Sequence, residues 1–185
     1  MSNPITRAAA ELQGFCEAAG WRFCFIGGIA VQRWGEPRLT QDADLTIITG
    51  FGGEATFVDE LLGSFEGRLP DAREFALRNR VLLAATAEGV PVDISLGAMP
   101  FEERAVSRAS DYAMAPDIII RTCGAEDLVV MKAFAGRDQD WLDIKGIVDR
   151  QAGTLDRELV FAELDPLLDL KEDGESGHRL RTLLD

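Results

Sequence analysis

Residues 25–48 read FIGGIAVQRWGEPRLTQDADLTII, a double glycine followed by two aspartates at the head of an apolar run. The aspartates, Asp42 and Asp44, are separated by one residue. In a β-strand, residues i and i+2 lie on the same face, with Cα atoms about 6.5–7 Å apart. Two carboxylates this close repel each other, and a divalent cation such as Mg²⁺ or Mn²⁺ offsets the repulsion. The pattern therefore predicts a strand that presents a metal-binding pair of carboxylates.

The double glycine, Gly27 and Gly28, lies thirteen or more residues ahead of these aspartates. A tight turn from a strand into a helix needs glycine where φ is positive. Such a turn also points backbone N–H groups outward at the start of the helix, where anions bind. The structural and the functional interpretations are compatible. A turn that can bind phosphates next to metal-binding carboxylates is typical of a phosphoryl-transfer site. The sequence therefore predicts such a site here.

A third acid interrupts a later apolar run, VPVDISL at residues 90–96. An unpaired carboxylate between apolar neighbours would be costly to bury, so Asp93 is expected to have a partner. If this run forms a strand beside the strand that carries Asp42 and Asp44, the three carboxylates converge. The proline at its second position lacks a backbone donor, so it should lie at the start or edge of the strand.

Composition limits the classes of protein that fit this chain. The formal net charge is −13 over 185 residues, which disfavours non-specific binding to DNA or RNA. Three scattered cysteines form no Cys-x-x-Cys pair, which argues against a disulfide framework or zinc site and for a reducing cytoplasm. The N-terminus does not read as a signal peptide, and no apolar run reaches the ~20 residues that cross a bilayer. We therefore expect a cytoplasmic protein with no membrane segment.

Hydrophobic periodicity and turn residues predict an α/β front and a helical tail. The expected domains are an α/β core at residues 1–124 and a helical region at residues 125–185. The expected helices are 4–19, 29–34, 54–62, 125–135, 138–150, 156–170 and 177–184, and the expected strands are 22–26, 43–49, 80–87, 90–96 and 117–121.

Together, the glycine turn and the three acids resemble the motif of a known protein family. A glycine turn (IGG, 26–28), an Asp-x-Asp strand (DADL, 42–45) and a third acid at Asp93 are similar to the pattern of the polymerase-β-like minimal nucleotidyltransferases. The likeness spans about residues 22–148 and is closest to the abortive-infection AbiEii-type proteins. It includes the block EDLVVMKAFAGRDQDWLDI at 126–144. Ala43 departs mildly from the pattern, because a larger apolar residue usually fills that position.

The resemblance implies a mixed small β-sheet flanked by helices and a nucleotidyltransferase activity. A nucleoside monophosphate would pass from a nucleoside triphosphate to a hydroxyl group, with release of pyrophosphate. Two Mg²⁺ or Mn²⁺ ions would bind the three acids, and Asp93 would alternatively accept the proton of the acceptor hydroxyl. The nucleotide-binding residues implied by the resemblance are Gly27, Gly28, Arg38, Thr40 and Lys132.

The resemblance leaves the biological setting open. The acceptor is a small hydroxylated molecule, a protein side chain or an RNA end, in a toxin–antitoxin or antibiotic-resistance setting. A homodimer or an antitoxin-type partner is considered as well. The alternative is a non-catalytic nucleotide-binding or toxin–antitoxin partner protein of the same fold. Retained turnover of a nucleoside triphosphate would separate the two hypotheses.

For Lys132, a functional role and an ordinary structural role are hardest to tell apart. A lysine on a helix is usually solvated, but this one lies between apolar residues, and the resemblance implies a contact with the triphosphate. On that hypothesis, Met in its place would remove the charge and leave the fold intact. For Arg137, Asp140 and Asp143 the sequence favours a salt-bridged turn between two helices over direct chemistry.

Overall fold

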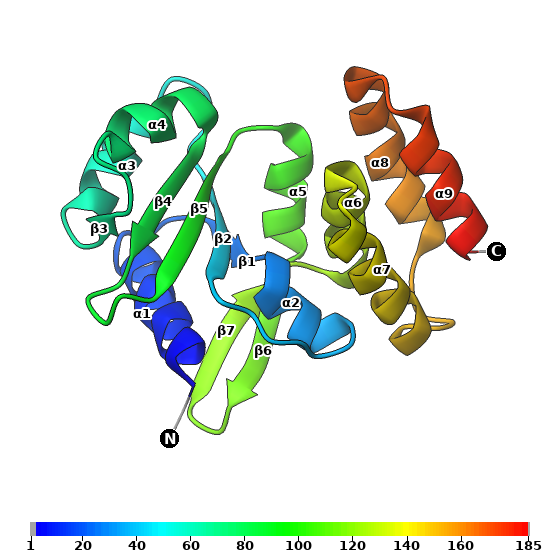
Figure 1. Ribbon diagram of the computed structural model, residues 1–185, viewed down its shortest axis with the longest axis horizontal. Coiled ribbons are helices and arrows are strands. Elements are labelled where there is room, and N and C mark those ends of the chain that lie inside the picture. The colour runs from blue at the N-terminus through cyan, green and yellow to red at the C-terminus, as the bar shows by residue number, and fades with distance from the viewer. Residues whose placement is uncertain (1–2, 185) are drawn as a thin grey trace. The chain divides into compact units, whose positions relative to one another are not determined.

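A computed structural model describes residues 3–184 (Figure 1). Their contacts divide the chain into two compact units, residues 3–29 with 39–123 and residues 30–38 with 124–184. The first unit carries a mixed sheet and the second is helical. The division into domains 1–124 and 125–185 stays a prediction, because a domain is defined by independent folding.

The first unit is built on a seven-stranded sheet, which confirms the predicted α/β class. The strand order is β3-β4-β5-β2-β1-β7-β6, in which β2 pairs with β5 and β1 with β7 in parallel. All other neighbours are antiparallel. The strands are β1 (Phe23–Phe25), β2 (Ala43–Ile48), β3 (Glu66–Gly67), β4 (Val81–Ala85), β5 (Pro91–Gly97), β6 (Ser110–Ala115) and β7 (Ile118–Thr122).

One face of this sheet forms the main core. Alternate residues of the central strands, such as Leu45, Leu82 and Ile94, are buried against the helices α1 (Pro4–Ala18), α3 (Glu54–Leu62) and α4 (Ala72–Asn79). Helix α5 (Pro100–Arg108) packs on β1 and β2 outside this cluster. Because strand side chains alternate between faces, the residues between these core positions lie on the opposite face. Those residues include the acids of interest.

The second unit consists of helices. Helix α2 (Gly27–Trp34) begins in the first unit and ends in the second. Helix α6 packs on α7, α8 and α9, and α8 packs on α9. The bounds are α6 (Ala125–Ala135), α7 (Asp138–Arg150), α8 (Arg157–Lys171) and α9 (Gly174–Leu184). Within residues 3–184, no helix has both the length and the apolar character needed to span a membrane.

Several expected boundaries differ from those observed. Helix α2 starts at Gly27 rather than Ile29, so both glycines belong to its first turn. Strand β2 starts at Ala43, as predicted, and ends at Ile48 rather than Thr49. Asp42 therefore lies just before the strand, so the expectation that both aspartates lie on one strand is wrong. Strand β4 begins after Arg80, whose φ of 55° is left-handed and cannot continue a strand. The proline of β5 is its first residue, as predicted.

Four elements were not predicted: β3, α4, α5 and β6. Strand β3 has only two residues, and helix α4 buries only two alanines, so neither produces an apolar pattern. Strand β6 lies at the sheet edge with no buried side chain. Helix α5 did carry a signal, because Pro100 begins it and Glu102 accepts hydrogen bonds from the backbone N–H groups just ahead of it.

Candidate active site

The two central parallel strands place two acids side by side. In the β2–β5 pairing, Asp44 is directly opposite Asp93. Residues opposite each other in neighbouring strands project to the same face of the sheet. Strands β2 and β5 are therefore neighbours, as the predicted convergence of the three acids requires. Asp42 joins them from the residue just before β2.

The three carboxylates converge as predicted from the sequence. One oxygen each from Asp42, Asp44 and Asp93 lies within 4.8 Å of the other two, and all three residues are partly buried. Hard oxygen donors this close together suit Mg²⁺ or Mn²⁺ in preference to softer metals. The donor set therefore fits a divalent cation, although the role of each acid stays a prediction.

Gly27 makes room for Asp44. Its φ is +54°, and a Cβ atom placed there would lie 1.9 Å from Oδ2 of Asp44. The next backbone N–H, that of Gly28, donates to the same oxygen over 3.3 Å. The N-terminal end of α2 thus meets a carboxylate, where the partial positive charge of a helix favours an anion. The glycine turn therefore positions Asp44, independently of any contact between the turn and phosphate.

Gly28 makes room for Thr40 in a similar way. A Cβ atom at Gly28 would lie 2.3 Å from Oγ1 of Thr40. That hydroxyl is 3.2 Å from the main-chain oxygen of Asp42 and 3.2 Å from its Oδ1. The second glycine therefore admits a threonine that holds Asp42. Nucleotide binding by Gly27, Gly28 and Thr40 stays a prediction, because the observed contacts are with the acids.

We expect Gly27→Ala to lower the free energy of unfolding by about 1–3 kcal/mol, because alanine is strained at positive φ and its methyl group displaces Asp44. Denaturant unfolding measures the loss. Gly14→Ala is the matched control, since Gly14 lies inside α1 with nothing within 4 Å of the added carbon. That control should be stabilised by about 0.5–1 kcal/mol. Equal stability of the two variants would contradict the packing argument.

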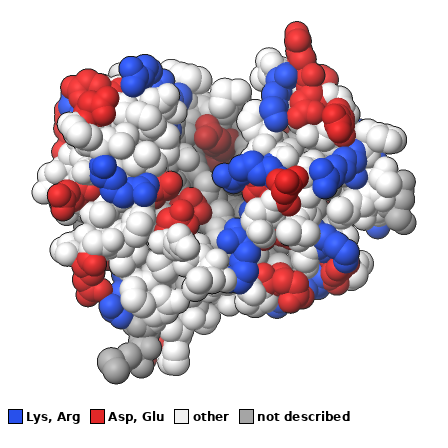
Figure 2. Space-filling view, in the orientation of Figure 1, with Lys and Arg blue, Asp and Glu red and all other residues white. Residues whose placement is uncertain are grey.

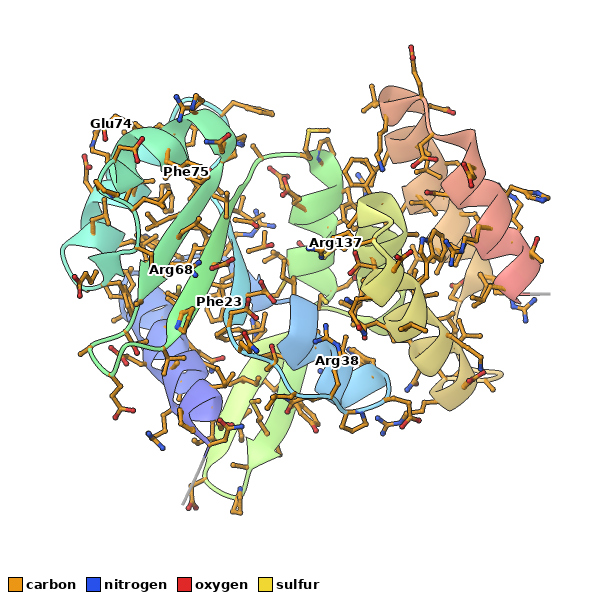
Figure 3. The ribbon with its side chains drawn as sticks, viewed as in Figure 1. Phe23, Arg38, Arg68, Glu74, Phe75 and Arg137 are labelled. Carbon is orange, nitrogen blue, oxygen red and sulfur yellow. The ribbon has the colours of Figure 1, made fainter. Side chains whose placement is uncertain are left out.

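Asp93 has an arginine partner, Arg68. The Arg68 guanidinium donates to Oδ1 of Asp93 from the segment after β3 (Figure 3). Burial raises the pKa of Asp93, the Arg68 charge opposes the rise, and the nearby Asp42 charge adds to it. The positive charge of Arg68 and the negative charge of Asp42 therefore act on the pKa of Asp93 in opposite directions. No sequence signal marks Arg68, because its approach depends on the strand order.

The second unit contains a buried ion cluster around Lys132. Its side chain is 5% exposed, and the ammonium group donates to Oδ2 of Asp143 over 2.6 Å and to Oδ1 of Asp140 over 3.2 Å. The side chains of Asp140 and Asp143 are 2% and 3% exposed, respectively. Lys132 is therefore not a solvated lysine, and its ammonium group contacts carboxylates of α7. Its contact with a triphosphate stays a prediction.

Each of these carboxylates also binds an arginine. The Arg38 side chain pairs with Asp143 through Nε at 2.8 Å and Nη2 at 3.0 Å. Arg137 pairs with Asp140 at the start of α7, at 2.7 Å. The predicted ion pairing in the turn between α6 and α7 is confirmed for Arg137 and Asp140, whereas Asp143 binds Lys132 and Arg38 instead. Lys132 thus helps to hold Asp143, and Asp143 holds Arg38.

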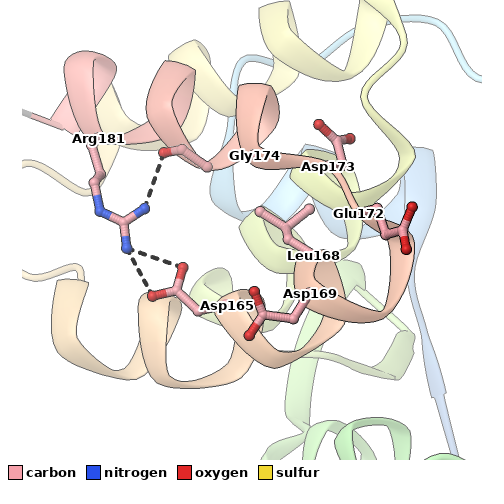
Figure 4. Close-up of a pocket in the computed structure, with 8 residues that line it drawn as sticks. Asp165, Leu168, Asp169, Glu172, Asp173, Gly174 and Arg181 are labelled. Carbon is pink, nitrogen blue, oxygen red and sulfur yellow. Dashed lines mark hydrogen bonds and ion pairs between the residues drawn. The ribbon is translucent and has the colours of Figure 1, made fainter.

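A separate hollow of about 460 Å³ lies between α8 and α9 (Figure 4). Arg181 crosses it, with Nη2 donating to both carboxylate oxygens of Asp165 at 2.7 and 3.0 Å. Backbone and side-chain hydrogen bonds from Ser176, with Lys171 also contributing, lower the pKa of Asp173 to about 2. These acids connect or cap helices, so we assign no chemistry to this hollow. Its other lining residues are Leu168, Asp169, Glu172, Gly174 and Gly177.

The charged surface is mixed. On the face shown in Figure 2, basic side chains lie in separate groups with acidic ones among them. The net charge of −13 adds a repulsive background for a polyanion. Both observations disfavour non-specific binding of a long nucleic-acid backbone.

Comparison with known proteins identifies the fold. No protein-family model matches the sequence, and neither does any curated protein. Among solved structures, an antigenic nucleotidyltransferase-like protein from Paracoccidioides brasiliensis aligns with a TM-score of 0.59 at 15% identity, covering 99% of this chain and 93% of that one. The antibiotic-resistance factor ANT(2'')-Ia aligns with a TM-score of 0.54 at 15% identity, covering 94% and 96%.

The chain has the nucleotidyltransferase fold. At this identity the likeness concerns the fold alone. The predicted fold class is therefore confirmed, whereas the closeness to AbiEii-type proteins stays a prediction. In this sheet, Asp44 of β2 is directly opposite Asp93 of β5.

Proposed function

We propose that this protein is a metal-dependent nucleotidyltransferase, which moves a nucleoside monophosphate from a nucleoside triphosphate to a hydroxyl acceptor. The observation that carries the proposal is the set of three carboxylate oxygens within 4.8 Å, from Asp42, Asp44 and Asp93. Two further observations support it: the nucleotidyltransferase fold, and the glycines that fit the chain around Asp44 and Thr40.

The three acids would hold two Mg²⁺ or Mn²⁺ ions. Bound there, the metal would supply Lewis-acid stabilisation of phosphate charge and lower the pKa of the attacking hydroxyl. The chain's own residues orient this set: Gly28 donates to Asp44, and the Thr40 hydroxyl lies against Asp42. Asp93, whose pKa is raised chiefly by burial, is suited to accept the proton of the acceptor hydroxyl as a general base.

We propose that the backbone N–H groups around Gly27 and Gly28 face the outer phosphates of the nucleotide. Nucleotide binding by Arg38 is proposed on the family resemblance of the sequence alone. Lys132 acts in this proposal as a positioning residue, because it shares Asp143 with Arg38. A direct contact of Lys132 with the triphosphate would require it to leave two buried carboxylates.

The setting of the reaction is also a proposal. The acceptor remains a small hydroxylated molecule, a protein side chain or an RNA end. A toxin–antitoxin or antibiotic-resistance role, a cytoplasmic location and a homodimer or antitoxin-type partner are proposed on the family resemblance of the sequence. One neighbouring structure is described as an antibiotic-resistance factor, which supports a small-molecule acceptor.

The test incubates the purified protein with Mg²⁺ and each nucleoside triphosphate labelled at the α-phosphate, with a cell lysate as the source of acceptors. Transfer of label to a new species, together with release of pyrophosphate, is the expected result. Binding of a triphosphate without pyrophosphate release from any of the four would instead support a non-catalytic nucleotide-binding protein of this fold.

Metal binding should also be visible in thermal stability. A metal that binds only the native state at a hundred times its dissociation constant stabilises it by about 2.7 kcal/mol. For a chain of this size, that raises the Tm by roughly 5–10 °C. Asp42→Asn should lose most of the shift, because it removes one anionic ligand.

The control for this measurement is Asp59→Asn. Asp59 also carries one negative charge, but its carboxylate is exposed and pairs with Arg73. The control should keep the full shift produced by MgCl₂ or MnCl₂ in scanning fluorimetry. Equal shifts in wild type and Asp42→Asn would place the metal elsewhere.

A further inference from the structure

Arg68 reaches Asp93 along a single row across the sheet. The backbone N–H of Arg68 donates to the Leu83 oxygen over 2.9 Å, which extends the β3–β4 ladder by one position. Leu83 is opposite Asp93, and Asp93 is opposite Asp44. Residues opposite each other share a face, so Arg68, Leu83, Asp93 and Asp44 project to the same side. The arginine therefore spans Leu83 and meets the acidic cluster from the β3 edge of the sheet.

This geometry supplies a counter-charge to the acidic cluster. Three carboxylates with oxygens within 4.8 Å carry up to three negative charges, and one of them pairs with the Arg68 guanidinium. The partners are 33% and 30% exposed, so the pair lies at the open face of the sheet rather than in the core. An ion pair at this position is accessible to exchange with a dissolved cation.

We propose that Arg68 is a resident counter-ion of the carboxylate cluster and competes with a divalent metal for Asp93. The proposal rests on the proposed function, because it assumes that the cluster is a metal site. In the metal-free protein, the guanidinium offsets repulsion among the acids. A doubly charged cation brought beside the same carboxylate repels the guanidinium, so Arg68 withdraws as the metal binds.

The competition has a measurable consequence for affinity. Removing the Arg68 charge deletes a repulsion between the metal and a fixed cation, so the metal should bind more tightly. At the distance of neighbouring ionic groups, the effect in water is about tenfold or more in the dissociation constant. A purely structural arginine that orients Asp93 would have the opposite effect, because losing such a partner weakens metal binding about 10–100-fold.

The experiment titrates Mn²⁺ alone into wild type, Arg68→Met and Arg68→Lys by calorimetry, without nucleotide. We expect Arg68→Met to bind Mn²⁺ about tenfold more tightly than wild type, and Arg68→Lys to stay within about threefold of wild type because it retains the charge. Arg68→Gln is a second uncharged variant, used if the methionine variant does not give a cooperative melt. Mn²⁺ binding in the uncharged variants that is unchanged from wild type, or weaker, would overturn the proposal. So would binding in Arg68→Lys as tight as in Arg68→Met.

Arg73→Met is the matched control. It also removes one positive charge from the first unit, but its partner Asp59 lies outside the acidic cluster. It should bind Mn²⁺ as wild type does, and a tenfold gain there would show a general charge effect and overturn the proposal. Failure of the proposed function is distinguishable, because neither wild type nor Arg68→Met would then bind Mn²⁺ in a manner abolished by Asp42→Asn.

Discussion

Asp44→Asn is expected to lower the rate of nucleotidyl transfer by about 10³–10⁴-fold while the protein stays folded. The substitution removes one negative ligand from the cluster of three carboxylates, and metal stabilisation of a phosphoryl transition state is worth several kcal/mol. Each 1.36 kcal/mol corresponds to a factor of ten in rate. The asparagine oxygen can still accept the hydrogen bond that Gly28 donates to Asp44, so the local turn is retained.

The measurement is release of pyrophosphate at saturating Mg²⁺, with Asp59→Asn as the control of equal charge change. Asp59 pairs with Arg73 outside the cluster, so this control should keep wild-type turnover. Circular dichroism should show the same helix content in all three proteins. Turnover by Asp44→Asn above a tenth of the wild-type rate would remove Asp44 from the reacting centre.

The acidic cluster could be anticipated from sequence because its information is local. Asp42 and Asp44 are two residues apart, and Asp93 is conspicuous as a charge inside an apolar strand. One topological assumption, that two strands are neighbours, was enough to bring them together. The strand pairing that sets Asp44 opposite Asp93 meets that assumption. Local patterns therefore predict a site well when only one long-range contact is needed.

Arg68 could not be anticipated in the same way. Its approach to Asp93 requires the pairing of β3 with β4 and of β4 with β5, and β3 itself is only two residues long. The same reason hid the roles of the two glycines. The sequence indicates a turn, but the side chains admitted by the missing Cβ atoms lie far along the chain: Asp44 is 17 positions from Gly27, and Thr40 is 12 positions from Gly28.

Lys132 shows a different limit of sequence patterns. Its apolar neighbours indicated correctly that its position was unusual, but not what it binds. Helices α6 and α7 are joined by a short turn, so acids of α7 reach back to α6. The expectation that methionine would leave the fold intact follows from the helix alone. The buried carboxylates Asp140 and Asp143 reverse that expectation.

Lys132→Met is expected to lower the free energy of unfolding by about 3 kcal/mol or more, because it leaves two buried carboxylates without their shared cation. Arg137 and Arg38 still pair with these acids, which keeps the loss near the lower end of the 3–5 kcal/mol typical of a broken buried pair. Urea unfolding measures the change. Lys145→Met is the control, since Lys145 pairs with Asp149 on the surface of α7 and should lose less than about 1 kcal/mol.

The same cluster should make stability depend on pH. Burial raises the pKa values of Asp140 and Asp143, but hydrogen bonds and charge from Arg137, Arg38 and Lys132 outweigh it and hold both below their usual range. A carboxyl whose pKa is lower in the folded state stabilises the protein above its unfolded pKa of about 3.9. That stability is lost as the pH falls through the lower, folded value. Without Lys132 the opposing burial effect gains weight, so the loss should begin at a higher pH.

A double variant separates this charge argument from loss of packing. Asp140→Asn in the Lys132→Met background removes one of the two carboxylates that the lysine neutralises. If charge imbalance causes the instability, the double variant loses less than the sum of the two single losses, by the 0.5–3 kcal/mol typical of residues in one network. Strictly additive losses would mean that methionine disturbs the packing of α6 instead. Coupling would establish that Lys132 stabilises α7, and through Asp143 the position of Arg38, before any nucleotide is bound.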